Sequence, residues 1–270
     1  MNKFEMFLVT RVGLMPVTIK GYVSAVKRIV RVIGENPDEN SVESYVNELY
    51  QSNYSYHHKL NNVLALEKYL SFLGRPIKFA RQRKPKPIIK ETLTEAEVTK
   101  LIFNTRNIRE KAIISLLAYS GIRNSEICNL KVSDFVFGEN RVNITEGKFA
   151  KDGICQVSPD CTKIINDYLT EFPRQRKEFL FTTLVKGNRM STWDIRKLLK
   201  VISKRSKIEK RVYPHLLRHS LTANMLLRGA DIVSLKNQLR HNWLESTLHY
   251  CNSIVFVDRN QYQKFAPSYC

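Results

Sequence analysis

Apolar residues recur at helical intervals through the first 75 residues of the chain. In the stretch TIKGYVSAVKRIVRVIG they stand three or four positions apart, at Ile19, Tyr22, Val23, Val26, Val30 and Ile33. This spacing places them on one face of a helix, which Gly34 and Pro37 end. Two further helices are predicted over residues 41–51 and 54–72. The pattern therefore predicts a small, all-helical domain over residues 1–75.

The pattern changes in RPIKFARQRKPKPIIK, residues 75–90. This stretch holds seven basic residues, three prolines and no acidic residue. Proline and repulsion between like charges both oppose helix formation, so residues 76–91 are predicted to form an extended, basic linker. Such a linker is either a solvated tether or a segment that follows a phosphate backbone. The charge of the whole chain favours the second interpretation.

Helical periodicity returns over residues 92–270, interrupted by one hairpin. Thr94 and Glu97 form a capping box before an apolar run. The stretch 108–119 is apolar on most sides and is expected to form a buried helix. Two strand-like runs, RVNITEG and ICQVSP, flank the polar turn KFAKDG, and helices are predicted from residue 160 onward. The predicted fold class is mainly α, with a small antiparallel β-sheet in the C-terminal domain.

Composition narrows the class of protein. The chain has 270 residues, 43% of them hydrophobic, which is enough for a substantial core. It lacks an apolar stretch of about 18 residues, and its first residues, MNKFEMFLVTRVGLMP, carry charges that a secretory signal would not. We therefore expect a cytoplasmic protein without a membrane partner. The five cysteines are odd in number and form no C-x-x-C pattern, which favours reduced thiols.

Charge indicates the partner. Lys and Arg number 44 against 25 Asp and Glu, which gives a net charge of +19. A strongly basic chain most often binds a polyanion, usually nucleic acid; a ribosome-associated or anionic-lipid-binding protein is the alternative. We expect nucleic acid as the partner. The candidate DNA-contacting residues are Lys20, Lys27, Arg28, Arg31, Arg81, Arg83, Lys84 and Lys86.

The candidate catalytic groups are cationic. The chain lacks P-loop, G-x-G-x-x-G and H-E-x-x-H patterns and has no clear acidic cluster, so we expect neither a metal ion nor a cofactor. Chemistry at a phosphate must then depend on cationic side chains. In YSGIRNSEICNL, Arg123 follows a glycine turn and Glu126 stands three residues later. If a helix begins at residue 124 or 125, Glu126 can turn back and hold the guanidinium of Arg123.

Two other stretches offer candidate groups. PHLLRHS places His215 and Arg218 on one face of a helix that begins near Pro214. EGKFAKDG places Lys148 and Lys151 in the hairpin turn. Each motif alone has an ordinary explanation: a chance pair, a surface ion pair or a solvated lysine.

Together, and in this order, the motifs resemble the tyrosine recombinase (phage integrase) family. The resemblance covers residues 92–260 and rests on P-H-x-L-R-H, then G-A-D-I, then a histidine followed nine residues later by a tyrosine. The matching residues are Pro214, His215, Leu217, Arg218, His219, Gly229, Ala230, Asp231, Ile232, His241 and Tyr250. SGIRNSEICNL resembles the first arginine box of the family, and Lys148 falls at its hairpin lysine. Residues 1–75 resemble the core-binding domain of the simple, Xer-like type.

The resemblance implies a site-specific DNA recombinase or integrase that uses neither metal nor ATP. Tyr250 is implied as the nucleophile that attacks a DNA phosphodiester, leaving a 3′-phosphotyrosyl link and a free 5′-hydroxyl. Arg123 and Arg218 are implied to clamp the two non-bridging oxygens of the phosphate. Their planar guanidinium forks suit that task.

The remaining implied roles are proton transfer and orientation. His215 is the implied proton acceptor, Lys148 protonates the leaving 5′-oxygen, and His241 donates to a phosphate oxygen. Glu126 orients Arg123, and Lys151 is the alternative to Lys148. We expect His219, His249 and the cysteines to take no part in the chemistry.

Arg240 departs from the family pattern, which has glycine just before the last histidine. Glycine there allows a tight turn with positive φ, a conformation that costs other residues on the order of 1 kcal/mol. Either the turn differs in this chain, or Arg240 tolerates it and adds a phosphate contact.

The resemblance also implies an assembly. The partner would be double-stranded DNA, and four protomers would hold two duplexes, with the tail over residues 251–270 docking on a neighbour. A tail folded back on its own protomer is the alternative. Two other functions stay open at this point, namely type IB topoisomerase activity and DNA binding without catalysis.

Overall fold

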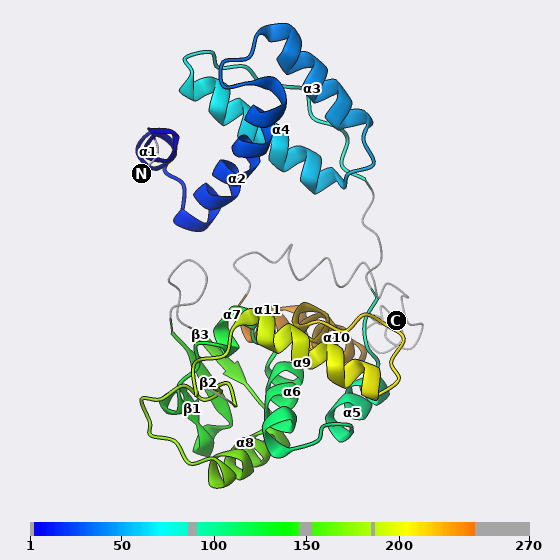
Figure 1. The fold of residues 1–270 in the computed structure, drawn as a ribbon. Helices are drawn as coiled ribbons and strands as arrows, with labels where there is room; N and C mark the ends of the chain where they lie inside the picture. Colours follow the sequence, from blue (N-terminus) through cyan, green and yellow to red (C-terminus); the bar gives the residue numbers. More distant parts are fainter. Residues whose placement is uncertain (1–2, 86–90, 146–152, 185–186, 241–270) are drawn as a thin grey trace, which may run out of the picture. The chain divides into compact units, whose positions relative to one another are not determined.

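The computed structural model describes residues 3–85, 91–145, 153–184 and 187–240. The chain divides into two compact units, residues 1–88 and 89–270, which Figure 1 draws in ribbon form. We call the first the helical unit and the second, which contains all of the candidate catalytic residues, the catalytic unit. Each is described by itself.

Four helices build the described part of the helical unit. They are α1 (Lys3–Thr10), α2 (Pro16–Ile33), α3 (Glu39–Gln51) and α4 (Tyr56–Phe72). Helix α2 packs along α4, and α1 contacts both of them. The core between them is apolar, with Leu8, Ile29, Val63 and Leu66 fully buried. The three predicted helices are present, whereas α1 was not predicted.

The segment after α4 lies on the helical unit. The Tyr50 hydroxyl donates to the carbonyl of Ala80 at 2.5 Å, and the backbone N–H of Phe79 donates to Glu67 at 2.9 Å. Ile77 and Phe79 pack against the helical core. The predicted linker over 76–91 is thus extended but attached in its first part, because two apolar side chains within the basic run are drawn into the core.

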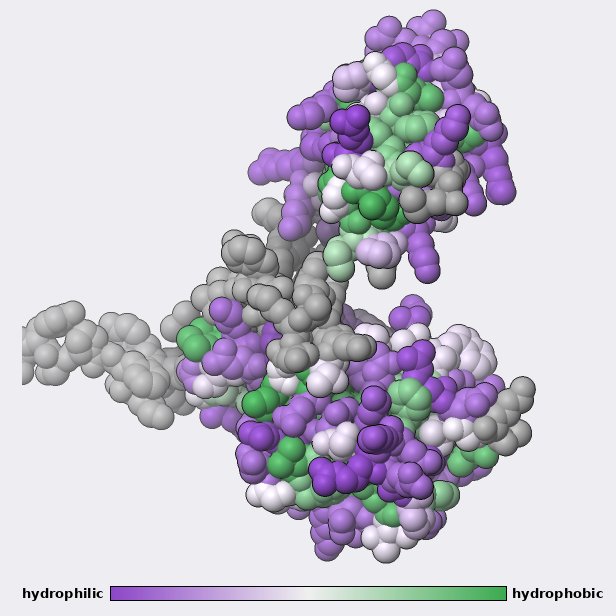
Figure 2. Space-filling model, turned by 90° about the vertical axis from the view of Figure 1, so that its left-hand side faces the viewer, coloured by the Kyte–Doolittle hydropathy of each residue, from purple (hydrophilic) through white to green (hydrophobic). Residues whose placement is uncertain are grey.

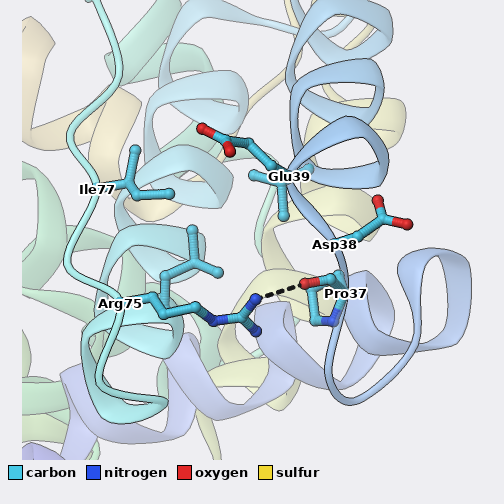
Figure 3. A pocket seen from close by; sticks show the side chains of 7 residues that line it. Pro37, Asp38, Glu39, Arg75 and Ile77 are labelled. Atoms are coloured by element: carbon cyan, nitrogen blue, oxygen red, sulfur yellow. Dashed lines mark hydrogen bonds between the residues drawn. The ribbon is translucent and has the colours of Figure 1, made fainter.

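A pocket of about 240 Å³ lies beside this segment in the helical unit (Figure 3). Arg75 closes one side of it by donating to the carbonyl of Pro37 at 2.9 Å and to the side chain of Asn36 at 2.7 Å. Arg75 therefore ties the loop between α2 and α3 to the chain that leaves α4.

The described part of the catalytic unit is mainly helical, with one small sheet. Its helices are α5 (Glu95–Phe103), α6 (Ile108–Ser120), α7 (Asn124–Ile127), α8 (Pro159–Glu171), α9 (Thr192–Arg205), α10 (Pro214–Leu227) and α11 (Ile232–Leu239). Strands β1 (Phe135–Val136), β2 (Arg141–Ile144) and β3 (Gly153–Gln156) pair antiparallel in that order, with Val142 opposite Cys155. Two single-turn 3₁₀ helices, Val132–Asp134 and Phe137–Glu139, flank β1. The predicted fold class is confirmed.

Helix α6 is the centre of this unit. It packs against α5, α8 and α10, and its side chains are buried around most of its circumference. A helix without an exposed face must be enclosed by neighbours, as the sequence predicted. The capping box of Thr94 and Glu97 is also present at the start of α5.

The surface of the catalytic unit is largely polar on the face that Figure 2 displays, with scattered apolar residues between the hydrophilic ones. In the described ranges, none of the helices combines the length and the apolar character that crossing a bilayer requires.

Candidate active site

The site begins where α6 ends. Gly121 follows α6 in the left-handed conformation, with φ of 62°. A Cβ at this position would lie 3.0 Å from side-chain carbons of both Leu221 and Leu239. Glycine is needed here because it accepts positive φ and leaves room for α10 and α11 to approach. The turn directs the chain into Arg123.

Arg123 and Glu126 form a tight local pair. Glu126 turns back from α7 and accepts from the backbone N–H of Arg123 at 2.8 Å and from its Nη1 at 2.7 Å. The predicted contact is therefore present. The side chain of Glu126 is 5% exposed and that of Arg123 is 29% exposed. The buried carboxylate of Glu126 thus fixes the position of the partly exposed guanidinium of Arg123.

Glu126 is held in its ionised form. Burial alone would raise its pKa, but the charge of Arg240 and the hydrogen bonds from Arg123 outweigh burial, so the pKa of Glu126 lies below its ordinary value.

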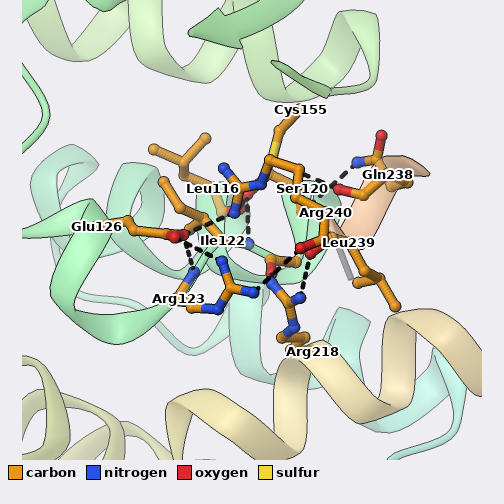
Figure 4. A network of polar contacts seen from close by, with 11 residues as sticks. Leu116, Ser120, Ile122, Arg123, Glu126, Cys155, Arg218, Gln238, Leu239 and Arg240 are labelled. Carbon is orange, nitrogen blue, oxygen red and sulfur yellow. Dashed lines mark hydrogen bonds and ion pairs between the residues drawn. The ribbon is translucent and has the colours of Figure 1, made fainter. Parts of the chain in front are cut away.

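Arg218 lies on α10 beside the turn at Gly121, and it is 1% exposed. Its Nη1 donates to the carbonyl of Gly121 at 2.5 Å, and its Nη2 donates to the carbonyl of Leu239. Arg218 therefore joins the ends of α6 and α11, as Figure 4 shows. The two predicted arginines meet at the chain turn that ends α11.

His215 lies one helical turn before Arg218 and is exposed. Its ring centre is 4.4 Å from that of His219, which is 3% exposed. The exposed ring can reach a bound substrate, whereas His219 belongs to the interior of the unit.

Arg240 forms the turn that the sequence left undecided. It has φ of 51° and ψ of 49°, the left-handed conformation expected of the family glycine. Its carbonyl accepts from Nη2 of Arg123 at 3.2 Å, and its own guanidinium lies 2.6 Å from Glu126. The described structure therefore supports the second alternative in part, since the turn is kept but the side chain binds Glu126.

Packing around Arg240 involves another glycine. A Cβ at Gly153, the first residue of β3, would lie 2.5 Å from Cδ of Arg240. The side chain of Arg240 thus passes β3 at a residue that has no side chain to obstruct it. Sequence reasoning missed both the ion pair with Glu126 and this close approach. The available signal was a charged residue at a position expected to hold glycine.

Four predicted catalytic candidates lie outside the described residues: Lys148, Lys151, His241 and Tyr250. Strands β2 and β3 bound the first two in sequence, and α11 precedes the other two.

The predicted DNA-contacting residues are mostly on the surface of the helical unit. Exposed side chains there include Lys20, Lys27, Arg31, Arg83 and Lys84. Arg28 donates to the Ser24 hydroxyl at 3.0 Å, and Arg81 pairs with Glu67 at 2.6 Å, so part of the charge of Arg81 is neutralised internally. Lys86 is outside the described residues.

In the described part of the site, positively charged side chains outnumber negatively charged ones. Arg123 and Arg240 bind one carboxylate, that of Glu126, and Arg218 lies at the same chain turn on the carbonyl of Leu239. In the described ranges, no group of three or more His, Cys, Asp or Glu is placed to hold a metal ion. An excess of guanidinium forks in a partly buried place suits an anion with several oxygens, such as a phosphodiester.

Comparison with known proteins indicates the family of this chain. A profile of the phage integrase family matches residues 91–255. "Tyrosine recombinase XerA" of Pyrococcus horikoshii is 32% identical over 80% of this chain and 76% of its own length. A crystal structure of XerA recombinase aligns over 99% of this chain and 98% of its own, with 28% identity and a TM-score of 0.59. A XerH site-specific recombinase bound to difH substrate has a TM-score of 0.71 at 18% identity, over 91% of this chain and 78% of its own.

The chain therefore belongs to the phage integrase family, and it is a Xer-like tyrosine recombinase. The family predicted from the sequence is confirmed. The comparisons do not favour the topoisomerase or the catalytically silent alternative.

Proposed function

We propose that this chain recombines DNA at specific sites by transferring a phosphodiester to Tyr250 and then to a second DNA end. The observation that carries the proposal is the meeting of Arg123 and Arg218 on the carbonyls of Leu239 and Arg240. The chain continues from that turn into His241 and, nine residues later, Tyr250. The turn where two arginines can bind an anion thus lies ten residues before the proposed nucleophile in the sequence.

The first step exchanges one phosphate ester for another. The phenol oxygen of Tyr250 bonds to phosphorus, and the bond from phosphorus to the 5′-oxygen breaks. Because a tyrosine has an ordinary pKa near 10, it needs a base, and His215 takes its proton. Lys148 protonates the leaving 5′-oxygen, with Lys151 as the alternative donor.

The arginines stabilise the charge that develops on phosphorus oxygens. In this proposal Arg123 and Arg218 each bind a non-bridging oxygen when DNA is present, and His241 donates a further hydrogen bond. Glu126 holds Arg123 in place. The 3′-phosphotyrosyl link keeps the bond energy, so a 5′-hydroxyl of the partner duplex reverses the step without ATP.

The helical unit is proposed to hold the duplex as a core-binding domain. Support comes from its exposed basic side chains and from the solved XerH recombinase of similar fold, which was bound to its substrate. Salt-sensitive phosphate contacts follow from this arrangement. We further propose a tetramer around two duplexes, with residues 251–270 docking on a neighbour, and association with the nucleoid.

Trapping of covalent adducts tests the function. A library of nicked duplexes with randomised sequence is incubated with the protein in EDTA, and DNA that survives detergent on the protein is sequenced. We expect wild-type protein to enrich one sequence, and Tyr250→Phe to bind that sequence without forming an adduct. An adduct that persists in Tyr250→Phe, or that requires a divalent metal, contradicts the proposal. Strand exchange between two copies of the selected duplex then completes the test.

A further inference from the structure

Arg240 is bound to the candidate catalytic residues at two points. Its carbonyl accepts from Nη2 of Arg123 at 3.2 Å, and its guanidinium lies 2.6 Å from Oε2 of Glu126. Glu126 in turn holds Nη1 of Arg123 through Oε1 at 2.7 Å. The three contacts close a ring. Arg240 contacts Arg123 directly through its carbonyl and indirectly through Glu126.

We propose that Arg240 is a positioning residue for Arg123, which it orients through Glu126 from the left-handed turn after α11. This inference rests on the proposed role of Arg123 at the phosphate. It assigns a function to the side chain that stands where the family pattern has glycine.

The burial of the three side chains indicates that Glu126 and Arg240 position Arg123, and not the reverse. The side chains of Glu126 and Arg240 are 5% and 12% exposed, whereas that of Arg123 is 29% exposed. Figure 4 shows the carboxylate of Glu126 between the two guanidiniums. The buried pair is therefore the fixed part, and the more exposed Arg123 is the group that it sets toward a substrate.

The side chain of Arg240 lies close to β3 at Gly153. Cδ of Arg240 lies where a Cβ at residue 153 would come within 2.5 Å. Gly153 and Arg240 therefore fit as a pair, and a side chain at residue 153 must displace the arginine. This gives a second way to disturb Arg240 without removing its charge.

Electrostatics supplies a readout that packing alone would not change. The charged groups that lower the pKa of Glu126 are Arg123, at the start of α7, and Arg240, at the end of α11. The charges of these arginines, of Arg218 and of Glu126 also act on the pKa of the buried Cys155 thiol in β3. Burial raises the pKa of Glu126, and the charge of Arg240 is the largest effect that lowers it. Without that charge the pKa rises, so Glu126 becomes protonated earlier as the pH falls and Arg123 loses its charged partner.

Single-turnover cleavage of the selected nicked duplex tests the proposal. Wild type is compared with Arg240→Gln, Arg240→Lys, Glu126→Gln and the Arg240→Gln/Glu126→Gln double variant, each at saturating protein. Arg205→Gln is the matched control, because Arg205 forms another partly buried pair, with Glu110 at 3.0 Å, away from the site.

We expect Arg240→Gln to cleave about 10- to 100-fold more slowly with unchanged DNA affinity, since small misplacement of a catalytic group has effects of that size. Its rate relative to wild type should fall further as the pH is lowered, because Glu126 without the charge of Arg240 is protonated at a higher pH. Arg240→Lys should recover part of the rate. In the Glu126→Gln background, Arg240→Gln should have little further effect, and that effect should not depend on pH.

The control Arg205→Gln should keep the wild-type rate and pH profile, although its melting temperature falls. If Arg240→Gln fails to fold, as circular dichroism would show, Gly153→Ala takes its place and should slow cleavage through the displaced Arg240. Equal rates at every pH, or the same fold-loss with and without Glu126, would overturn the proposal. Wild-type protein that forms no adduct overturns the proposed function itself, and this inference with it.

Discussion

The two units of this chain bury different kinds of residue. Among the described residues of the helical unit, Asn62 is the polar residue with less than a tenth of its surface exposed, and the rest of that core is apolar. The catalytic unit buries Arg109, Glu126, Arg218 and His219 to a similar degree. Burial of charge is costly unless hydrogen bonds compensate it. The contrast indicates that apolar packing stabilises the core of the helical unit, whereas the catalytic unit also holds charged side chains in fixed positions.

Two buried arginines of the catalytic unit refine this contrast. Arg109 donates to the carbonyl of Thr182 and to the sulfur of Met190, and burial lowers its pKa. Arg218 instead donates to the helix ends beside Arg123. Burial of a cation is therefore not by itself a sign of catalysis; convergence of two cations on one turn is the informative feature.

The largest expected effect concerns Arg218. Arg218→Lys should slow single-turnover cleavage about 100- to 1000-fold, because an ammonium cannot replace both parallel donors of the fork. Arg109→Lys is the matched control, and it should lower thermal stability while leaving the cleavage rate of the folded protein unchanged. Similar loss of cleavage in both variants would contradict the distinction between the two arginines.

A core substitution in the helical unit should affect stability alone. Leu66→Ala removes a fully buried side chain of α4 and should lower the stability of that unit by about 2 to 5 kcal/mol. Both tryptophans, at positions 193 and 243, belong to the catalytic unit. Circular dichroism should therefore report an earlier transition, while the midpoint of tryptophan fluorescence stays in place. A common shift of both signals would show that the units unfold together.

The smallest expected effect concerns the exposed cations of α2. Lys27→Gln should weaken DNA binding modestly and reduce the slope of log affinity against log salt by about 0.9, as for one lost phosphate contact. Lys163→Gln, at an exposed position of α8 in the other unit, serves for comparison. An unchanged slope for Lys27→Gln would remove this residue from the proposed DNA surface.

Local patterns in the sequence predicted much of this structure. The buried helix α6, the capping box at Thr94 and the pair of Arg123 with Glu126 all depend on residues a few positions apart. Periodicity and capping rules apply at that range. The order of the cationic motifs supplied the family.

Long-range contacts could not be predicted in the same way. Arg218 and Gly121 are 97 residues apart, and Arg240 and Glu126 are 114 apart, so the fold alone brings them together. Arg240 was expected either to alter the turn or to contact phosphate, and its bond to a buried carboxylate depends on the gap at Gly153. The attachment of residues 75–82 was missed because net charge masked the apolar residues Ile77 and Phe79.

The most direct test of the account is the chemical identity of the trapped link. Wild-type protein is trapped on the selected nicked duplex, digested with protease, and the DNA-bound peptide is sequenced by mass spectrometry. The account predicts a peptide that carries Tyr250 joined to a DNA 3′-phosphate, with a free 5′-hydroxyl on the released strand. Attachment through another residue, or through a 5′-phosphate, would contradict it.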